Sequence, residues 1–410
     1  MMMNILVGGK IFDGEDGLIK DNEIIITRNN KIFKIIKKKI DIEGLKKVYP
    51  HGNFIFLDDK NVIMPGLIDC HVHVGLEGLP NTYEENLVDD KLRTVKAASD
   101  MEKTLMAGYT TVRNAGSVNW IDLSIKDAIK KRYILGPKII TAGKIISITT
   151  AGAEYFEGLY EEVDGPEGFR HAARIQLKKG AELIKVMATG AIMNPGSVPG
   201  AVQADEDEIR AVVKEARKLN KRVAAHAHAA EGIKNAVKAG VNTIEHGTFA
   251  DEEAHDLMLS EDVYLIPTLS PGYYMDKYGS AGGIAPHMLK MIKKRRQTRI
   301  EALQRAIEKG VKVACGSDAG TPYNYHKNNN IEARLFVRLG LMTSAEALTA
   351  NTKYSADACG LLDEIGTIKE GKRADIIVVK GNPVKDIQLL ADENNVQVVI
   401  KEGEIVKNLI

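Results

Sequence analysis

Residues 65–75, PGLIDCHVHVG, join an apolar run to two histidines, His71 and His73. In a β-strand, side chains two positions apart project to the same face, so both imidazoles can reach one ion. Histidine is the commonest metal ligand among the side chains. The stretch therefore predicts a strand that ends at a metal site.

The composition is that of a globular protein without a strong charge bias. The chain has 410 residues, of which 44% are hydrophobic, and 56 Lys and Arg against 55 Asp and Glu give a net charge of +1. This length fits a large α/β unit with a smaller one. The balanced charge argues against a nucleic-acid partner. The basic clusters at 37–39 and 293–296 lack interleaved aromatic residues, so we interpret them as solvated faces.

Cysteine usage and the N-terminal sequence bear on the compartment. The three cysteines, Cys70, Cys315 and Cys359, are far apart in the chain and form no Cys-x-x-Cys pair. This pattern suits a reducing compartment. No run approaches the roughly 18 apolar residues of a membrane span, and no basic segment followed by a long apolar one opens the chain. We therefore expect a cytoplasmic protein with no membrane association.

The middle of the chain, residues 62–361, alternates strand-like apolar runs with segments of helical periodicity. The strand at 62–74 is followed by seven further candidates, at 110–113, 139–141, 183–186, 223–228, 241–246, 264–268 and 311–318. Helices are predicted at 84–107, 166–179, 205–220, 231–239 and 284–309. Repeating βα units in this number predict a (β/α)8 TIM barrel of the α/β class. A doubly wound sheet is the alternative, although no Gly-x-Gly-x-x-Gly opens a first helix.

Both ends of the chain are rich in short strands. Apolar runs punctuated by Gly and Asn predict strands at 4–7, 23–26, 31–36, 374–379, 396–401 and 405–406. Two β-rich ends around a different middle predict one discontinuous domain. We expect a small β-sandwich built from residues 1–61 and 362–410, beside the barrel of residues 62–361.

Polar residues at the predicted strand ends form a set with metal-ligand chemistry. In a (β/α)8 barrel the C-terminal strand ends converge on one mouth. The residues at those ends are His71, His73, Lys185, His226, His228, His246 and Asp318, which include five of the ten histidines. Imidazoles with a carboxylate suit Zn²⁺, and Mn, Co, Ni or Fe by the same ligand preferences.

Lys185 is the unusual member of this set. A lysine in a barrel mouth beside cations loses hydration and meets like charge, which favours its neutral form. A neutral amine can add CO2 to become an anionic carbamate, which can bridge two metals about 3.5–4 Å apart. The alternative is a lysine that reaches solvent or pairs with an acid.

The ligand set in this order resembles the amidohydrolase superfamily with a binuclear centre. The lead-in at 65–69 and the segment GTIKEGKRAD at 366–375 resemble it too, so the resemblance spans essentially the whole chain. The segments VAAHAH at 223–228 and GVNTIEHG at 240–247 look most like the Xaa-Pro and Xaa-Arg dipeptidases and carboxypeptidases. Imidazolonepropionase-like enzymes are near neighbours.

The resemblance implies two divalent metal ions, with zinc expected. It assigns His71, His73 and Asp318 to one metal, His226 and His246 to the second, and a carboxylated Lys185 as the bridge. His226 and His228 project to the same side of their strand, so His228 is the alternative ligand there. His228 would then lie over the substrate and polarise its carbonyl or steady the tetrahedral oxyanion. The alternative role for His228 is support of a neighbouring ligand.

The implied reaction is hydrolysis of a C–N amide bond in a small molecule, a dipeptide or an N-acyl amino acid. A hydroxide shared by the two metals attacks the carbonyl, and Asp318 carries the proton to the leaving amine. The alternatives are a cyclic amide or amidine hydrolase or deaminase, and a non-catalytic scaffold of the same fold. We also expect a homo-oligomer.

Substrate-binding residues are harder to identify. Arg113 could grip a substrate carboxylate, or form a structural ion pair. Tyr323, with Tyr325 and His326, could line the pocket or pack within its loop. The glycine content of residues 270–288 is typical of a mobile lid. The segment at 149–155 lacks the histidine that many relatives carry after the third strand, and its Glu154 could favour a cationic substrate or lie on the surface.

Overall fold

The computed structural model describes residues 2–410 except 22, 37–40, 193, 195–197, 199 and 285, and the side chains of Thr82 and His287 are also left aside. The basic cluster at 37–39 lies outside the described residues. The chain divides into two compact units. The first comprises Met1–Ile68, Lys103–Thr111 and Ala333–Ile410, and the second comprises Asp69–Glu102 and Val112–Glu332.

In the first unit, both ends of the chain contribute strands to one eight-stranded sheet. Its order is β17-β16-β15-β5-β1-β3-β4, and β2 pairs with β1. The strands are β1 (Met3–Phe12), β2 (Ile19–Asp21), β3 (Ile24–Arg28), β4 (Lys31–Ile36), β5 (Asn53–Pro65), β15 (Ile376–Lys380), β16 (Val396–Lys401) and β17 (Glu404–Asn408). β1 and β5 are parallel and the other pairs are antiparallel. The strands predicted at the two termini therefore belong to one sheet.

Alternating apolar residues give this sheet a buried core. Leu6, Ile25, Ile63, Val378 and Val398 lie in one cluster that draws on strands from both ends of the chain. Their neighbours in β1 and β3 pack on the opposite face beside helix α1 (Ile42–Val48), which Asp41 caps by accepting two backbone N–H groups. The unit also holds α11 (Ser344–Thr349), which opens with a capping box, and α12 (Ser355–Ala358).

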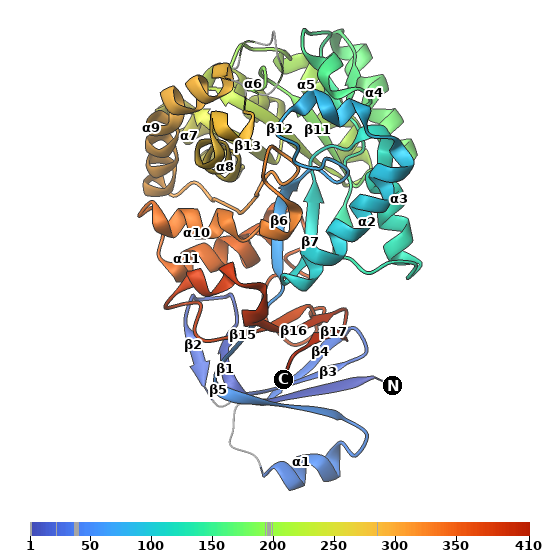
Figure 1. Cartoon of the computed structure of the whole chain (residues 1–410), viewed down its shortest axis with the longest axis vertical. Coiled ribbons are helices and arrows are strands. Elements are labelled where there is room, and N and C mark those ends of the chain that lie inside the picture. The colour runs from blue at the N-terminus through green and yellow to red at the C-terminus, as the bar shows by residue number, and fades with distance from the viewer. Residues whose placement is uncertain are drawn as a thin grey trace. The chain divides into compact units, whose positions relative to one another are not determined.

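The second unit is built around parallel strands (Figure 1). A six-stranded sheet has the order β10-β9-β11-β12-β13-β14, with parallel pairs throughout, and a three-stranded sheet has the order β6-β7-β8. The strands are β6 (Leu67–Val72), β7 (Tyr109–Asn114), β8 (Lys138–Ile140), β9 (Ile145–Ser147), β10 (Tyr160–Glu162), β11 (Leu183–Met187), β12 (Arg222–Ala229), β13 (Thr243–Phe249) and β14 (Tyr264–Ile266). The fold is thus of the α/β class.

Backbone hydrogen bonds connect the two sheets. The N–H of Leu183 at the start of β11 donates to the carbonyl of Thr141, which follows β8, at 3.2 Å. On the other side, Leu265 and Val313 form one parallel bridge, and Val72 and Ala319 form another. The predicted eighth strand at 311–318 is therefore a segment with isolated bridges at its two ends, not a regular strand.

Helices connect the parallel strands, and α4, α5 and α6 lie outside β11, β12 and β13 (Figure 1). The helices are α2 (Asp90–Met106), α3 (Ile121–Lys130), α4 (Gly165–Lys179), α5 (Glu206–Lys218), α6 (Ala230–Ala239), α7 (Glu252–Ser260), α8 (Ser270–Tyr278), α9 (Pro286–Lys309) and α10 (Ile331–Arg338). Gly180 and Gly240 close α4 and α6 in the left-handed conformation, with φ of 105° and 95°. The next strand can then begin within a few residues.

Two expectations about local structure were wrong. The predicted strand at 62–74 is interrupted at Gly66, where a Cβ atom would lie 2.2 Å from Thr110 Oγ1. Only glycine permits so close an approach of the backbone to β7. The segment 270–288 is not a continuous loop, because it contains helix α8. Its Pro271 lies in the first helical turn, where proline is tolerated.

Within the described part of the chain, no helix combines the length and the apolar character that crossing a bilayer requires.

Candidate metal centre

The predicted ligands lie together at the C-terminal ends of the parallel strands. All of them are at least nine-tenths buried: His71, His73, Lys185, His226, His228, His246 and Asp318. The ligand atoms form two groups, and within each group they lie within 4.8 Å of one another. One group comes from His226, His228 and His246, and the other comes from His71, His246 and Asp318. We call His71, His73, Asp318 and the adjacent Glu245 the acidic half, and His226, His228 and His246 the imidazole half.

In the acidic half, hydrogen bonds fix the tautomer of both histidines. The Nδ1 atom of His71 donates to Glu245 Oε2 at 2.6 Å, and that of His73 donates to the carbonyl of Gly116 at 3.0 Å. The opposite ring atoms, Nε2, lie 3.5 Å and 3.3 Å from Asp318 Oδ1. With Nδ1 protonated, each Nε2 presents a lone pair to this carboxylate.

The charge states of Asp318 and His71 make the atoms that face each other in the acidic half hydrogen-bond acceptors. Burial raises the pKa of Asp318, but His71, His73 and Lys185 outweigh it and lower the value to about 2. Burial, with the charge of Lys185, lowers the pKa of His71 to about 4. At neutral pH the carboxylate is therefore ionised and His71 is neutral. Three acceptor atoms that converge in a buried site are what a divalent cation requires.

Glu245 connects the acidic half to Arg113. The Arg113 guanidinium donates to Glu245 Oε1 at 2.7 Å, to Thr243 Oγ1 at 3.0 Å and to the Cys70 carbonyl at 2.5 Å. Arg113 is 2% exposed. These contacts are those of the structural ion pair and leave Arg113 beneath the ligands, supporting His71 through Glu245.

Asp69 is a buried support that the sequence interpretation did not assign. Its carboxylate accepts the backbone N–H groups of His71 and Ser317 at 3.0 Å each, the Ser317 hydroxyl at 2.5 Å and the Asn329 amide at 2.7 Å. These contacts fix β6 against the segment that carries Asp318. Alternation along the strand places Asp69, His71 and His73 on one face, so the signal was present in the sequence.

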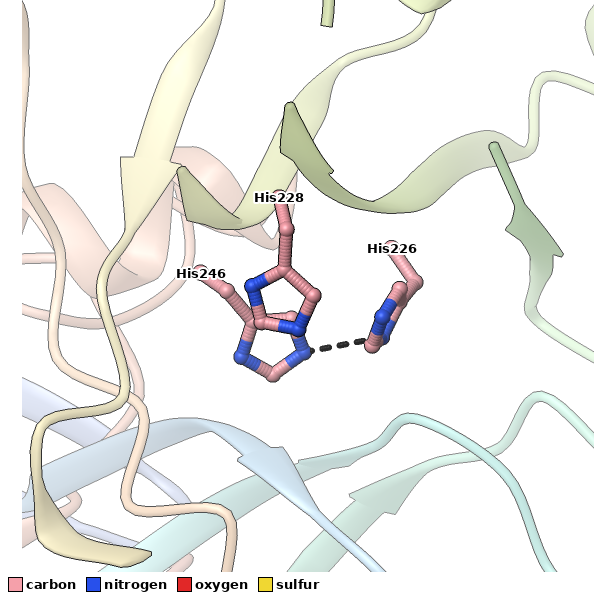
Figure 2. A group of neighbouring side chains, drawn as sticks. All are labelled: His226, His228 and His246. Carbon is pink, nitrogen blue, oxygen red and sulfur yellow. Dashed lines mark hydrogen bonds between the residues drawn. The ribbon is translucent and has the colours of Figure 1, made fainter. Parts of the chain in front are cut away.

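The imidazole half consists of three rings that face one another (Figure 2). The His226 and His246 ring centroids are 4.4 Å apart, and His226 Nδ1 lies 3.0 Å from His246 Nε2. The His226 and His228 centroids are 4.7 Å apart, as expected for side chains two positions apart on β12. Burial comes first among the causes that lower the pKa of each ring. All three are therefore neutral at pH 7 and can act as ligands.

Threonine hydroxyls orient this half. His246 Nδ1 lies 2.6 Å from Thr268 Oγ1, and His228 Nδ1 lies 2.8 Å from Thr248 Oγ1. His226 Nε2 is buried and has no hydrogen-bond partner among the described residues. A buried polar atom without a partner is costly, and a metal ion would satisfy this unpaired nitrogen atom of His226.

The backbone around these ligands is strained. His246, Thr268 and Asp318 adopt φ values of 73°, 48° and 56°, in the left-handed region that non-glycine residues rarely occupy. Thr268 is β-branched, which makes its conformation the least favourable of the three. Such conformations persist only where the surroundings hold them, and they cluster at functional sites.

Two charged residues hold the segment that contains Thr268. Arg299 donates to the carbonyls of Pro267 and Thr268. Glu332 accepts the backbone N–H groups of Leu269 at 2.7 Å and Ser270 at 2.9 Å. The Arg299 guanidinium on the carbonyl groups and the Glu332 carboxyl group on the N–H groups therefore fix the turn that places the Thr268 hydroxyl against His246.

Lys185 projects from β11 into the same buried region. It is 1% exposed, and burial lowers its pKa to about 8, although Glu245 and Asp318 raise it. The charge of Lys185 is also among the causes that lower the pKa of His226 and His246. Lys185 is thus close enough to both halves to interact with each, and burial favours its neutral amine.

The loop residues expected to line the substrate pocket differ in their burial and contacts. Tyr323 donates its hydroxyl to the Gly282 carbonyl at 2.5 Å and stacks on Tyr278 with centroids 4.1 Å apart. Tyr325 is 42% exposed and His326 is buried. Glu154 accepts the backbone N–H of Gly152 within its own loop at 2.9 Å. Tyr323 therefore couples the segment after α8 to the loop after Asp318.

Comparisons with known proteins agree with this geometry. Residues 62–406 match the amidohydrolase family. A solved structure of a Xaa-Pro dipeptidase with bound methionine in the active site is similar, with 33% identity, a TM-score of 0.90, and coverage of 99% of this chain and 100% of that chain.

Two curated proteins are also similar. Ochratoxinase from Aspergillus niger is 30% identical over 99% of this chain and 87% of that protein. Imidazolonepropionase from Thermoplasma volcanium is 36% identical over 100 residues, 24% of each chain. With a family match across most of its length, the chain belongs to the amidohydrolase family and is a hydrolase acting on carbon–nitrogen amide bonds.

Proposed function

We propose that this protein is a metal-dependent amidohydrolase that cleaves the C–N amide bond of a dipeptide or an N-acyl amino acid. The observation that carries the proposal is the convergence of three buried acceptors, His71 Nε2, His73 Nε2 and Asp318 Oδ1, beside the imidazole half. The similar Xaa-Pro dipeptidase and the similar ochratoxinase support amide hydrolysis. Methionine in the active site of the former supports an amino-acid product.

For the architecture, we propose a (β/α)8 barrel over residues 62–361, beside a β-sandwich of residues 1–61 and 362–410. The barrel is supported by the backbone bonds that connect the two parallel sheets on both sides, from Thr141 to Leu183 and through the bridges at Val313 and Ala319. The sandwich is supported by the core that strands from both termini share.

We assign the residues that hold the metals as the donor chemistry suggests. His71, His73 and Asp318 would hold one divalent ion and His226 and His246 the second, and Lys185, as a carbamate, would supply an anionic ligand. Zinc is the expected metal, because imidazoles and a carboxylate suit it. Bound there, the two ions polarise the substrate carbonyl and lower the pKa of water toward neutrality.

The carbamate forms when the neutral Lys185 amine attacks CO2. A nitrogen–carbon bond forms as one C=O π bond of CO2 breaks and its electron pair moves to oxygen, and the nitrogen releases one proton to water, so a neutral side chain becomes an anion. The burial that lowers the pKa of Lys185 to about 8 supports this assignment, because the neutral amine is the reactive form.

Asp318 and His228 perform the proton and charge transfers. The ionised Asp318 accepts a proton from the attacking water and passes it to the nitrogen of the leaving amine. His228 is neutral, because burial lowers its pKa to about 3. When Nδ1 accepts a hydrogen bond from the Thr248 hydroxyl, Nε2 carries the ring proton and its N–H can donate to the developing oxyanion.

A second candidate is hydrolysis of a cyclic amide or amidine. The partial similarity to imidazolonepropionase favours it, since it covers 100 residues at 36% identity. The homo-oligomer, the cytoplasmic location, and the absence of nucleic-acid and membrane partners remain predictions.

The test is a screen of the zinc-loaded protein with dipeptides, N-acyl amino acids and cyclic amides, together with metal analysis. We expect linear substrates to be cleaved and about two zinc ions per chain, as two-metal hydrolases hold. Asp318→Asn should lower kcat at least about 1,000-fold, because it removes the proton carrier and a metal ligand together. Asp276→Asn is the matched control, since Asp276 pairs with Arg296 on the surface.

The outcomes separate the candidates. Cleavage of cyclic amides alone would support the second candidate. Near-normal turnover by Asp318→Asn, with the fold intact by circular dichroism, would contradict the site assignment.

A further inference from the structure

Helix α9 carries a cation that the sequence interpretation placed on a solvated face. Arg295 belongs to the basic run at 293–296, yet its side chain is only partly exposed. Its Nη1 atom is buried and has no hydrogen-bond partner among the described residues. A buried guanidinium N–H without an acceptor costs free energy, so this atom is a vacant donor for an anion.

The neighbours of Arg295 place this donor near the imidazole half. Its guanidinium carbon lies 5.3 Å from the centre of the Phe249 ring, and Phe249 ends β13 three residues after His246. Helix α9 packs against β13. The cation therefore lies at the C-terminal end of the strand that supplies a metal ligand.

Arg299 confirms which face of α9 is involved. Residues four apart lie on the same face of a helix, one turn from each other. Arg299 reaches the carbonyls of Pro267 and Thr268, and the Thr268 hydroxyl contacts His246. One arginine of this face is thus used to hold the site, and the other, one turn closer to the start of α9, keeps a free donor.

The surface neighbour provides a contrast. Arg296 has a side chain that is 62% exposed and pairs with Asp276 at 3.2 Å. It has the ordinary environment of a solvated arginine.

Electrostatics agree with this placement. Burial is the largest cause of the low pKa of His228, and the charges of Arg299 and Arg295 follow it. The positive charge of Arg295 thus acts on the ring that we place over the scissile carbonyl.

We propose that Arg295 binds a carboxylate of the substrate, and that the enzyme therefore selects amides whose amine portion or acyl portion bears a free carboxylate near the scissile bond. A guanidinium forms strong, charge-assisted hydrogen bonds to carboxylates. The Phe249 ring would hold the guanidinium plane in place. The inference rests on the proposed function for the identity of the bond that is broken.

In this proposal Arg295, and not Arg113 as the sequence suggested, binds the substrate carboxylate. Arg113 is buried against Glu245 and positions His71, whereas Arg295 retains an unpaired donor. Neutral amides lack the group that would satisfy this donor, so they should be poorer substrates.

The experiment compares each acid substrate with its carboxamide in the wild type, Arg295→Met, Arg295→Lys and Arg296→Met. For Arg295→Met we expect kcat/KM of the acid to fall about 10- to 100-fold, the range for a hydrogen bond to a charged group. The fall should come mainly through KM. The carboxamide should change less than about threefold, Arg295→Lys should restore part of the loss, and Arg296→Met should behave as wild type.

Two results would overturn the inference: equal losses for acid and carboxamide, which mean a structural role, or no loss for the acid. If the wild type cleaves no linear amide, the proposed function fails, and calorimetric binding of N-acetyl amino acids to the zinc-loaded protein decides the inference. Weaker binding to Arg295→Met than to Arg296→Met supports it, and equal binding contradicts it.

Discussion

The two halves of the candidate metal centre offer ligand atoms to a cation with different charge. In the acidic half, the histidines donate to Glu245 and to a carbonyl, and Asp318 lies between their free nitrogen atoms. In the imidazole half, the ring nitrogens contact threonine hydroxyls and one another. One half therefore brings its own negative charge and the other half brings neutral donors.

This difference explains why a lysine belongs in the centre. A divalent ion held by Asp318 has a compensating anion, whereas an ion held by neutral imidazoles needs one from elsewhere. A carbamate on Lys185 would turn its neutral amine into that anion without any other change in sequence. On the proposed assignment, the acidic half would bind its ion without modification, and the imidazole half would depend on Lys185.

The largest expected effect is in the acidic half, on replacement Glu245→Gln. This change leaves the Arg113 guanidinium buried without its anion, and losing one partner of a buried ion pair costs about 3–5 kcal/mol. It also removes the acceptor that fixes the His71 tautomer. We expect a lower free energy of unfolding, measured with urea, and loss of zinc from the acidic half.

Glu308→Gln is the matched control, because Glu308 is exposed on α9 and accepts only from Gln304 among the bonds seen at its carboxylate. Unchanged stability and zinc content in Glu245→Gln would mean that the acidic half does not depend on its buried carboxylate pair.

A smaller effect is expected in the imidazole half, on replacement Thr268→Val. The isosteric side chain keeps the shape but removes the hydroxyl that orients His246. Losing a hydrogen-bond partner of a metal ligand typically lowers metal affinity about 10- to 100-fold. Competition with a chelator should show weaker binding of one zinc ion of the two.

A serine variant at position 268 distinguishes the orienting effect of the hydroxyl on His246 from the packing of the threonine side chain. Thr268→Ser keeps the hydroxyl and should restore zinc affinity, while Thr94→Val, which removes an exposed hydroxyl on α2, should change nothing. Equal losses in the valine and serine variants would show that Thr268 acts through its backbone conformation alone.

The sequence was informative where a regular pattern carried the residues. Alternation on β6 and β12 placed His71 with His73 and His226 with His228 on shared faces, and the structure brings all four together. It was uninformative where the backbone leaves the regular pattern. Glu245 and His246 are adjacent, so alternation points them apart, but φ of 73° at His246 lets both serve the site.

Contacts between distant segments were also hidden. Neither Arg299 nor Glu332 belongs to a recognisable motif, and their function depends on a turn at 267–270 that propensity does not predict. Arg295 was assigned to a solvated face because charge runs usually are one. Its burial depends on how α9 packs against β13, which no local pattern records.

The last expected effect is a pH dependence of stability, which comes from Glu332, one of the two charged residues that hold the segment containing Thr268. Burial raises the pKa of Glu332 to about 7 from its ordinary value of 4.5, against the hydrogen bonds from Ser270 and Leu269 and the charge of Arg299, which lower it. The folded state therefore binds this proton more tightly than the unfolded state, so the contribution of Glu332 to stability is present below about pH 4.5 and is lost as pH rises through about 7. A single group changes the free energy of unfolding by at most about 1.4 kcal/mol per pH unit. In Glu332→Gln this dependence should disappear. Urea unfolding across this range should therefore show the free energy of unfolding of the wild type falling relative to that of the variant as pH rises. A constant difference would mean that Glu332 keeps one charge state throughout.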